Sequence, residues 1–179
     1  MIIEHLFYNT AISLIAGTIL ARKQVDGASL YPWIILLSAY VPDLTAIIRS
    51  VENLLELNIP FLATIPQKDG FHTIGALVCY MVLIGLLSYL LNLRFNISFL
   101  FAGIGYGAHL FADALAYPRG YELLWPLSSD NVGIGIFDPY TPDIFGIAES
   151  TPLAIGIVLF VLSFLIHTYF TPRRAERTG

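Results

Sequence analysis

The chain has 179 residues, of which 56% are hydrophobic and 12% are charged, and so few charges cannot cover the surface of a soluble globule of this length. The mean hydropathy of +0.73 accordingly predicts an integral membrane protein. The formal net charge is only −4, which gives no indication of a nucleic-acid surface, and a single cysteine excludes both an intrachain disulfide and a cysteine-based metal site. Histidine and carboxylate side chains remain as the strong metal ligands.

Five apolar segments are long enough to cross about 30 Å of hydrocarbon, which takes roughly 20 helical residues. They comprise residues 3–21, 30–48, 73–92, 97–117 and 152–170. The first segment carries Glu4 and His5 at its start and lacks a basic n-region, so we interpret it as a retained helix rather than a signal peptide. In the fourth segment Gly103 and Gly107 form a small-xxx-small pattern, which predicts a face for close helix packing. We therefore expect an all-α, polytopic membrane helix bundle with about five transmembrane helices, folded as a single domain over residues 1–179.

A shorter amphipathic segment lies between the second and third apolar segments, at residues 49–68. It mixes Val51 and Leu54 with Glu52 and Glu56, a pattern that is typical of a short helix lying in the membrane interface. Such a helix could flank the route by which a lipid reaches a site, or it could be a surface helix with no role beyond packing.

Basic residues in the loops predict the orientation of the chain. Six of them fall on one side of the predicted membrane, namely Arg22, Lys23, Arg94, Arg173, Arg174 and Arg177. Three fall on the other side, namely Arg49, Lys68 and Arg119. The positive-inside rule then places the N-terminus outside and the C-terminus in the cytoplasm.

With this topology, five potential metal ligands from four segments lie at one depth near the outer side. They are His5, Asp43, His72, His109 and Asp113. The pair His109 and Asp113 is spaced i, i+4 and so shares one helix face. A purely structural cluster of hydrogen bonds is the competing interpretation, but three imidazoles and two carboxylates inside a membrane protein are costly to bury without a cation. His167 falls at the opposite end of the fifth segment, and we leave it out of the site.

Imidazole with carboxylate suits zinc, and also manganese or iron, so we expect one or two divalent ions with zinc the foremost candidate. Asp43, His72, His109 and Asp113 are the predicted catalytic set around the principal ion, and His5 is predicted on a second or more weakly held ion. Asp43 could instead act as the base that orients a water molecule, and Asn9, one turn after His5, could support the His5 imidazole. A bound metal ion makes hydroxide available at neutral pH for attack on a phosphorus or acyl centre.

These residues, in this order, resemble the YdjM-like family of membrane-bound metal-dependent hydrolases. The matching motifs are the N-terminal His5, "PDL" at 42–44, "FHT" at 71–73 and "HLFADALAYPRGYELLWP" at 109–126, with Gly120, Leu124 and Pro126 in place. The resemblance spans roughly residues 1–130 and implies a membrane-embedded hydrolase that is distantly similar to zinc-dependent phospholipase C and P1-type nucleases. Thr45, Gln67 and Thr73 depart from the family pattern, and the chain lacks the further His-x3-Glu element of the soluble phospholipases, which argues against a trinuclear zinc cluster.

We therefore expect an enzyme that hydrolyses a phosphoester of a membrane lipid or a lipid-linked substrate at the outer membrane boundary. The choice of a phosphoester rests on the resemblance alone. The alternatives are a non-catalytic membrane scaffold of the same fold, with a structural metal or polar cluster, and a transporter. A transporter is less favoured because the inner halves of the predicted helices carry few polar residues. No nucleic-acid partner is expected.

Overall fold

Helices make up the regular structure of the protein in the computed structural model, which describes residues 2–56, 71–136 and 150–171. The elements are α1 (Ile2–Arg22), α2 (Tyr31–Ser38), α3 (Leu44–Leu54), α5 (Ile74–Leu90), α6 (Phe95–Ala116) and α7 (Ser150–Phe170). The described residues contain no β-strand, only an isolated antiparallel bridge between Tyr121 and Val132. The all-α prediction is confirmed for this part of the chain.

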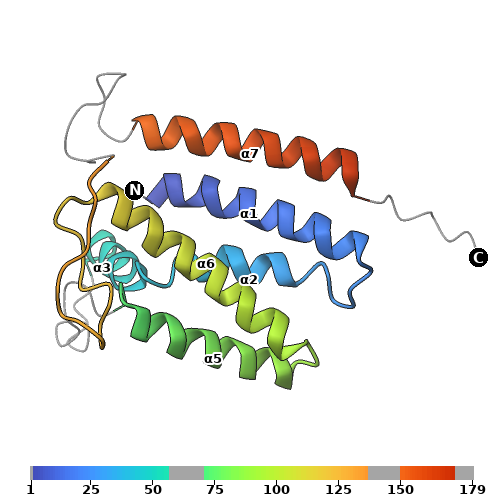
Figure 1. The fold of residues 1–179 in the computed structure, drawn as a ribbon, viewed down its shortest axis with the longest axis horizontal. Coiled ribbons are helices and arrows are strands. Elements are labelled where there is room, and N and C mark those ends of the chain that lie inside the picture. Colours follow the sequence, from blue (N-terminus) through green and yellow to red (C-terminus); the bar gives the residue numbers. More distant parts are fainter. Residues whose placement is uncertain (1, 57–70, 137–149, 172–179) are drawn as a thin grey trace, which may run out of the picture.

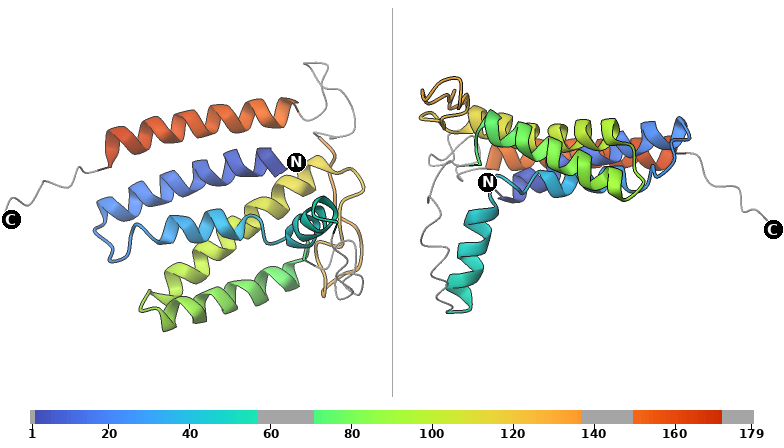
Figure 2. Two further views of the ribbon diagram at one scale, coloured as in Figure 1. Left: turned by 180° about the vertical axis from the view of Figure 1, so that it is seen from behind. Right: turned by 90° about the horizontal axis from the view of Figure 1, so that it is seen from below.

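Five of these helices lie side by side along one direction, and α3 lies across the end of the group (Figures 1 and 2). Helices α1, α5 and α7 run one way, whereas α2 and α6 return (Figure 1). Helix α1 packs against α7, α2 and α6, and α6 packs in turn against α2 and α5. Because of this alternation, the start of α1, the turn between α2 and α3, the start of α5 and the end of α6 lie at the same end of the bundle (Figure 1).

The predicted number of transmembrane helices is wrong: among the described residues only two helices, Phe95–Ala116 and Thr151–Phe170, are long and apolar enough to cross a membrane. Helix α5 has 17 residues and is too short by this measure. The predicted segment 30–48 is interrupted, because α2 ends after eight residues and a turn that contains Pro42 separates it from α3. Helix α1 has 21 residues and is long enough, but polar side chains in its first three turns lower its mean hydropathy, and it is not among the two candidates.

The core lies where α1, α2 and α6 meet, and it is built around Leu20, Tyr31, Ile35 and Phe101. Helix α6 approaches α2 closely at Gly105, where an added Cβ would lie 2.1 Å from the carbonyl oxygen of Ile35. Only a residue without a side chain permits this approach.

The sequence predicted that Gly103 and Gly107 allow close helix packing. This is confirmed for Gly103 and is wrong for Gly107. An added Cβ on Gly103 would lie 2.6 Å from Cε of Met81 in α5, whereas one on Gly107 would meet nothing within 4 Å. The i, i+4 spacing indicated the right helix, but the closest contact falls on Gly105, between the two.

The predicted interfacial helix is present in part, as α3, and residues 57–68 of that prediction lie outside the described part of the chain. No residue of α3 is buried, and its apolar residues Leu44, Val51 and Leu54 are 44%, 46% and 80% exposed. Its position across the end of the bundle (Figure 2) suits a helix in the membrane interface. The membrane contact itself stays a prediction.

Candidate metal centre

All five predicted ligands lie together at the end of the bundle where α1, the α2–α3 turn, α5 and α6 meet. His5 lies in the first turns of α1, Asp43 precedes α3, His72 precedes α5, and His109 and Asp113 lie in the last two turns of α6. We call these five residues the His/Asp cluster. Residues separated by up to 108 positions in the sequence are thus in direct contact.

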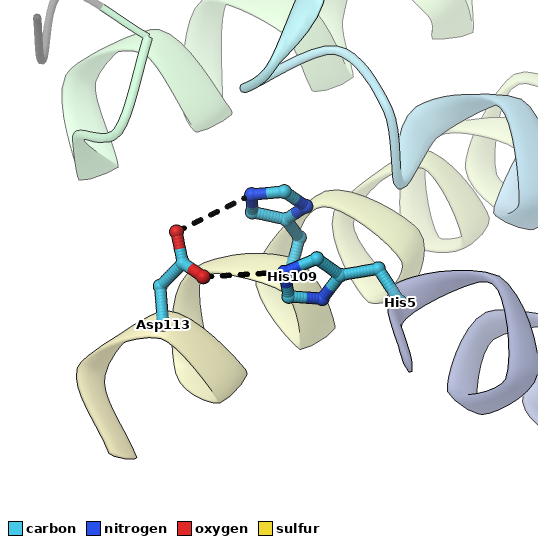
Figure 3. Close-up of side chains that lie close together, drawn as sticks. All are labelled: His5, His109 and Asp113. Atoms are coloured by element: carbon cyan, nitrogen blue, oxygen red, sulfur yellow. Dashed lines mark hydrogen bonds and ion pairs between the residues drawn. The ribbon is translucent and has the colours of Figure 1, made fainter. Parts of the chain in front are cut away.

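Asp113 is the hub of the His/Asp cluster. Its Oδ1 accepts a hydrogen bond from Nε2 of His5 at 3.2 Å, and its Oδ2 lies 3.4 Å from Nε2 of His72 and 3.4 Å from Nε2 of His109. Figure 3 shows the carboxylate facing the rings of His5 and His109. One carboxylate therefore contacts all three imidazoles.

Asp43 closes the His/Asp cluster from the other side. Its Oδ1 lies 3.4 Å from Nε2 of His72 and its Oδ2 lies 3.8 Å from Nε2 of His109. The His5 and His109 rings stack with their centroids 4.0 Å apart. The Asp43 side chain is 22% exposed, against 4% for the Asp113 side chain, so Asp43 forms the accessible side of the cluster.

Several buried imidazole nitrogens of the cluster have no hydrogen-bond partner among the described residues. They are Nδ1 of His5, Nε2 of His72 and both ring nitrogens of His109. The contacts of 3.4 Å and longer with the carboxylates are charge contacts without hydrogen-bond geometry. Because a buried polar atom without a partner costs free energy, these nitrogens are candidate ligands for a cation.

The donor set and its spacing fit a divalent cation. Two groups of three residues place a ligand atom from each member within 4.8 Å of the others: His5, His109 and Asp113 form one group, and Asp43, His72 and His109 form the second. The groups share His109, so the arrangement suits a single ion or two adjacent ions. Two ionised carboxylates carry a charge of −2, which one divalent cation would neutralise.

Two residues of the cluster, Asp43 and His72, lie in the turns before α3 and α5, and their pKa values are shifted by the charged groups around them. Burial raises the pKa of the Asp43 carboxyl, but its contacts with His72 and the charge of His109 outweigh burial and hold the pKa below its usual range. Burial lowers the pKa of the His72 imidazole, but the two carboxylates outweigh it and raise the pKa to about 9. In the metal-free protein a proton therefore occupies His72 at neutral pH, and a metal ion must displace it.

The sequence profile of the YdjM inner membrane protein family matches residues 2–174. The chain belongs to this family. The match confirms the family that the motifs indicated, and together with two apolar helices it supports an inner membrane protein. Searches among curated proteins and among solved structures found no match. The distant similarity to phospholipase C and P1-type nucleases stays a prediction.

Two residues next to the helix starts show how the chain positions the His/Asp cluster. Thr73, next to His72, caps α5 by accepting a hydrogen bond from the amide of Ala76 at 3.1 Å, which begins the helix directly after the ligand. Asp43 stands at the N-cap position of α3 but makes no capping bond with its side chain. Its carboxylate is thus left for the cluster.

The loop after α6, residues 117–136, ties the start of α5 to the end of α6. The amides of Ile74 and Gly75 donate to the carbonyls of Leu123 and Trp125, at 2.8 and 2.9 Å, and the amide of Ile134 donates to the carbonyl of Ala114 at 2.7 Å. Gly120 has φ +57, and a Cβ there would lie 1.7 Å from the Val132 carbonyl oxygen. The family motif from His109 to Pro126 therefore includes both ligands and the loop that positions His72.

Two tyrosines support the cluster and were not found from the sequence. The Tyr121 ring stacks on the His72 ring with centroids 4.4 Å apart and an interplanar angle of 20°. The Tyr106 hydroxyl donates to the carbonyl of Phe71, immediately before His72. No spacing in the sequence indicated either contact.

Within the described ranges, the other polar residues noted in the sequence add no ligand to the His/Asp cluster. Asn9 donates a hydrogen bond to the main-chain carbonyl of His5 at 2.9 Å, so it supports the helix turn and does not contact the imidazole. Arg119 is exposed, Thr45 lies in α3, and Gln67 and Lys68 lie outside the described residues. His167, which we left out of the site, lies near the far end of α7, where Nδ1 is 2.9 Å from the Thr18 hydroxyl.

Proposed function

We propose that the protein is a membrane-embedded, metal-dependent hydrolase that cleaves a phosphoester of a lipid or lipid-linked substrate. The observation that carries the proposal is the convergence of three imidazoles and two carboxylates, with buried unpartnered nitrogens, at one end of a membrane helix bundle. Perturbed titratable groups in such a cluster are characteristic of functional sites. The choice of phosphoester follows the family resemblance and not the geometry.

In this proposal all five cluster residues would hold metal. When bound, a divalent cation supplies Lewis acidity, which activates water and polarises a phosphoryl oxygen. Asp113 orients three imidazoles at once, and the stacked His5 and His109 rings leave little freedom for either side chain. Asp43 is the partly exposed carboxylate, and its low pKa keeps it ionised at neutral pH. It is therefore the group we assign to orient a substrate water.

A lipid substrate is favoured by the apolar surface around the cluster. In the loop after α6, Trp125, Leu127 and Ile134 are 51%, 83% and 62% exposed. The apolar side of α3 adds Leu54 at 80% exposure at the same end of the bundle. Large exposed apolar side chains beside a polar site suit a substrate whose head reaches the cluster while its tail stays in the bilayer.

The side of the membrane on which the cluster lies is part of the proposal. The excess of basic residues near the other end of the helices favours an outer location for the cluster and a cytoplasmic C-terminus. A C-terminal reporter that fluoresces only in the cytoplasm tests this orientation. Fluorescence supports it, and a dark but full-length fusion contradicts it.

A non-catalytic metal or polar cluster is the second candidate, because the hydrogen bond between His5 and Asp113 already satisfies part of the cluster. The two functions are separated by an assay of the zinc-loaded or manganese-loaded protein in lipid nanodiscs, with phospholipids and isoprenoid phosphates as substrates. We expect release of a water-soluble phosphate product by the parent. Asp43→Asn leaves the group of His5, His109 and Asp113 intact, so it should still hold an ion there while it loses most of the activity. A metal-loaded parent that cleaves neither lipid class supports the scaffold instead.

A further inference from the structure

A second feature with binding character lies at the opposite end of the bundle from the His/Asp cluster. It is a groove of about 1200 Å³ that runs along α1 and is also lined by the loop between α1 and α2, by α2 and by the end of α7. Helix α1 contributes small or short side chains, among them Thr10, Ser13, Gly17 and Ala21. Side chains of this size leave space along the helix, and Pro32 of α2 packs closely on α1 at Gly17, where an added Cβ would lie 3.1 Å from its Cγ.

The length of the groove matches one leaflet of a bilayer. Its lining runs along α1 from Thr10 to Arg22, which at 1.5 Å per residue is about 18 Å. Half of a 30 Å hydrocarbon core is about 15 Å. A single acyl chain lying along α1 therefore fits the groove, with its head at the Arg22 end.

Cationic and hydrogen-bonding groups gather at that end. The Nε of Arg22 donates to the carbonyl of Phe170 at 3.0 Å, which fixes the guanidinium beside the last turn of α7. His167 also lines the groove, and its Nδ1 lies 2.9 and 3.1 Å from the hydroxyls of Thr18 and Thr171. These contacts leave Nε2 of His167 as the ring nitrogen available to a ligand.

The lining also contains one acidic residue, Asp26, whose side chain is 98% exposed. Asp26 faces Arg94, with 3.8 Å between its Oδ2 and Nη2 of Arg94. The groove thus has an apolar, leaflet-length body and a positively charged head end. We propose that it binds one anionic phospholipid of the leaflet opposite the His/Asp cluster, with its phosphate at Arg22 and one acyl chain along α1. This inference does not depend on the hydrolase activity.

Trp33 on the wall of the groove provides a direct test, because it is 59% exposed and is one of only two tryptophans in the chain. In a Trp125→Phe background, Trp33 is the single tryptophan. Its quenching is measured in bilayers that contain brominated phosphatidylglycerol or brominated phosphatidylcholine at equal mole fractions. We expect the anionic lipid to bind beside Trp33 about fivefold more tightly, the preference that one Arg at an anionic bilayer surface gives.

Three variants decide whether the preference arises in the groove. Arg22→Gln should abolish it, Arg22→Lys should keep most of it, and Lys23→Gln should leave it unchanged, because Lys23 is adjacent and exposed but does not line the groove. Equal quenching by both lipids in the parent overturns the proposal, because it would show that the lipid beside Trp33 exchanges freely with the bulk bilayer and is not selected by charge. A preference that survives Arg22→Gln, or that disappears in Lys23→Gln, also overturns it and assigns the effect to general surface charge.

Discussion

Replacement of Gly105 by alanine should separate α6 from α2 and weaken both the fold and the metal centre. The new Cβ would lie 2.1 Å from the carbonyl oxygen of Ile35 and 2.9 Å from its carbonyl carbon. A carbon–oxygen contact needs about 3.3 Å, so α2 must retreat by roughly 1 Å. The obstructing atoms are main chain and cannot turn aside, unlike the end of a flexible side chain.

The size of the effect follows from a matched variant in the same helix. Gly107→Ala adds the same methyl group where nothing lies within 4 Å. Both variants gain helix propensity, about 1 kcal/mol, and this gain cancels in their comparison. Overpacking against a rigid neighbour costs about 1–3 kcal/mol, and contact with main chain places Gly105→Ala at the upper end. We expect the free energy of unfolding to be about 3 kcal/mol lower for Gly105→Ala than for Gly107→Ala.

The comparison is made by denaturant unfolding of both variants in the same detergent, followed by circular dichroism. Helix α2 leads into the turn that carries Asp43, so the metal affinity of Gly105→Ala should fall together with its stability, while Gly107→Ala keeps both. Equal unfolding free energies for the two variants would refute the close approach of α6 to α2.

Three further predictions concern His72 and its supports. The pKa of His72 is raised from its ordinary 6.5 to about 9. The protonated His72 therefore stabilises the metal-free protein fully below pH 6.5, and this stabilisation is lost as the pH rises through about 9. A metal ion must displace the same proton, so zinc affinity measured in chelator buffers should rise about tenfold per pH unit from pH 7 towards 9; a flat profile contradicts protonation of His72. Tyr121→Ala should lower zinc affinity about tenfold by freeing the His72 ring, whereas Tyr121→Phe keeps the stacked ring and most of the affinity; equal losses would mean that stacking is not the cause. Thr73→Ala removes the cap on α5 and should lower the unfolding free energy by about 1 kcal/mol, and an unchanged value in denaturant titration argues against the cap.

The five residues of the cluster could be predicted from the sequence because ionisable side chains are rare in apolar segments. Each of them stood near the same end of an expected helix, and an alternating bundle brings those ends together. The i, i+4 spacing of His109 and Asp113 placed both side chains on one face of α6, and they are 3.4 Å apart. Depth along the membrane axis was therefore enough to predict that these five side chains lie together.

Other features depend on tertiary contacts that hydropathy does not encode. An apolar run from 30 to 48 looks like one span, but the turn around Pro42 divides it, and this break brings Asp43 to the cluster. The stacking of Tyr121 on His72 arises from the loop that Gly120 makes possible, and its spacing from the ligand in sequence carries no signal. Gly105 was missed because a spacing pattern identifies a helix face but not which glycine meets main chain.

The central claim, that the His/Asp cluster binds a divalent cation, is tested most directly by elemental analysis of the detergent-purified protein. Three proteins are compared after equal incubation with zinc and removal of loose metal by gel filtration. They are the parent, a His109→Ala, Asp113→Ala double variant, and a His167→Ala control that removes an imidazole at the other end of the bundle.

We expect about one or two zinc ions per chain in the parent and in the control. The double variant should hold none while its circular dichroism spectrum stays helical. A parent that binds neither zinc nor manganese, or a folded double variant that keeps the full complement, would contradict the account and leave the cluster as a purely structural network.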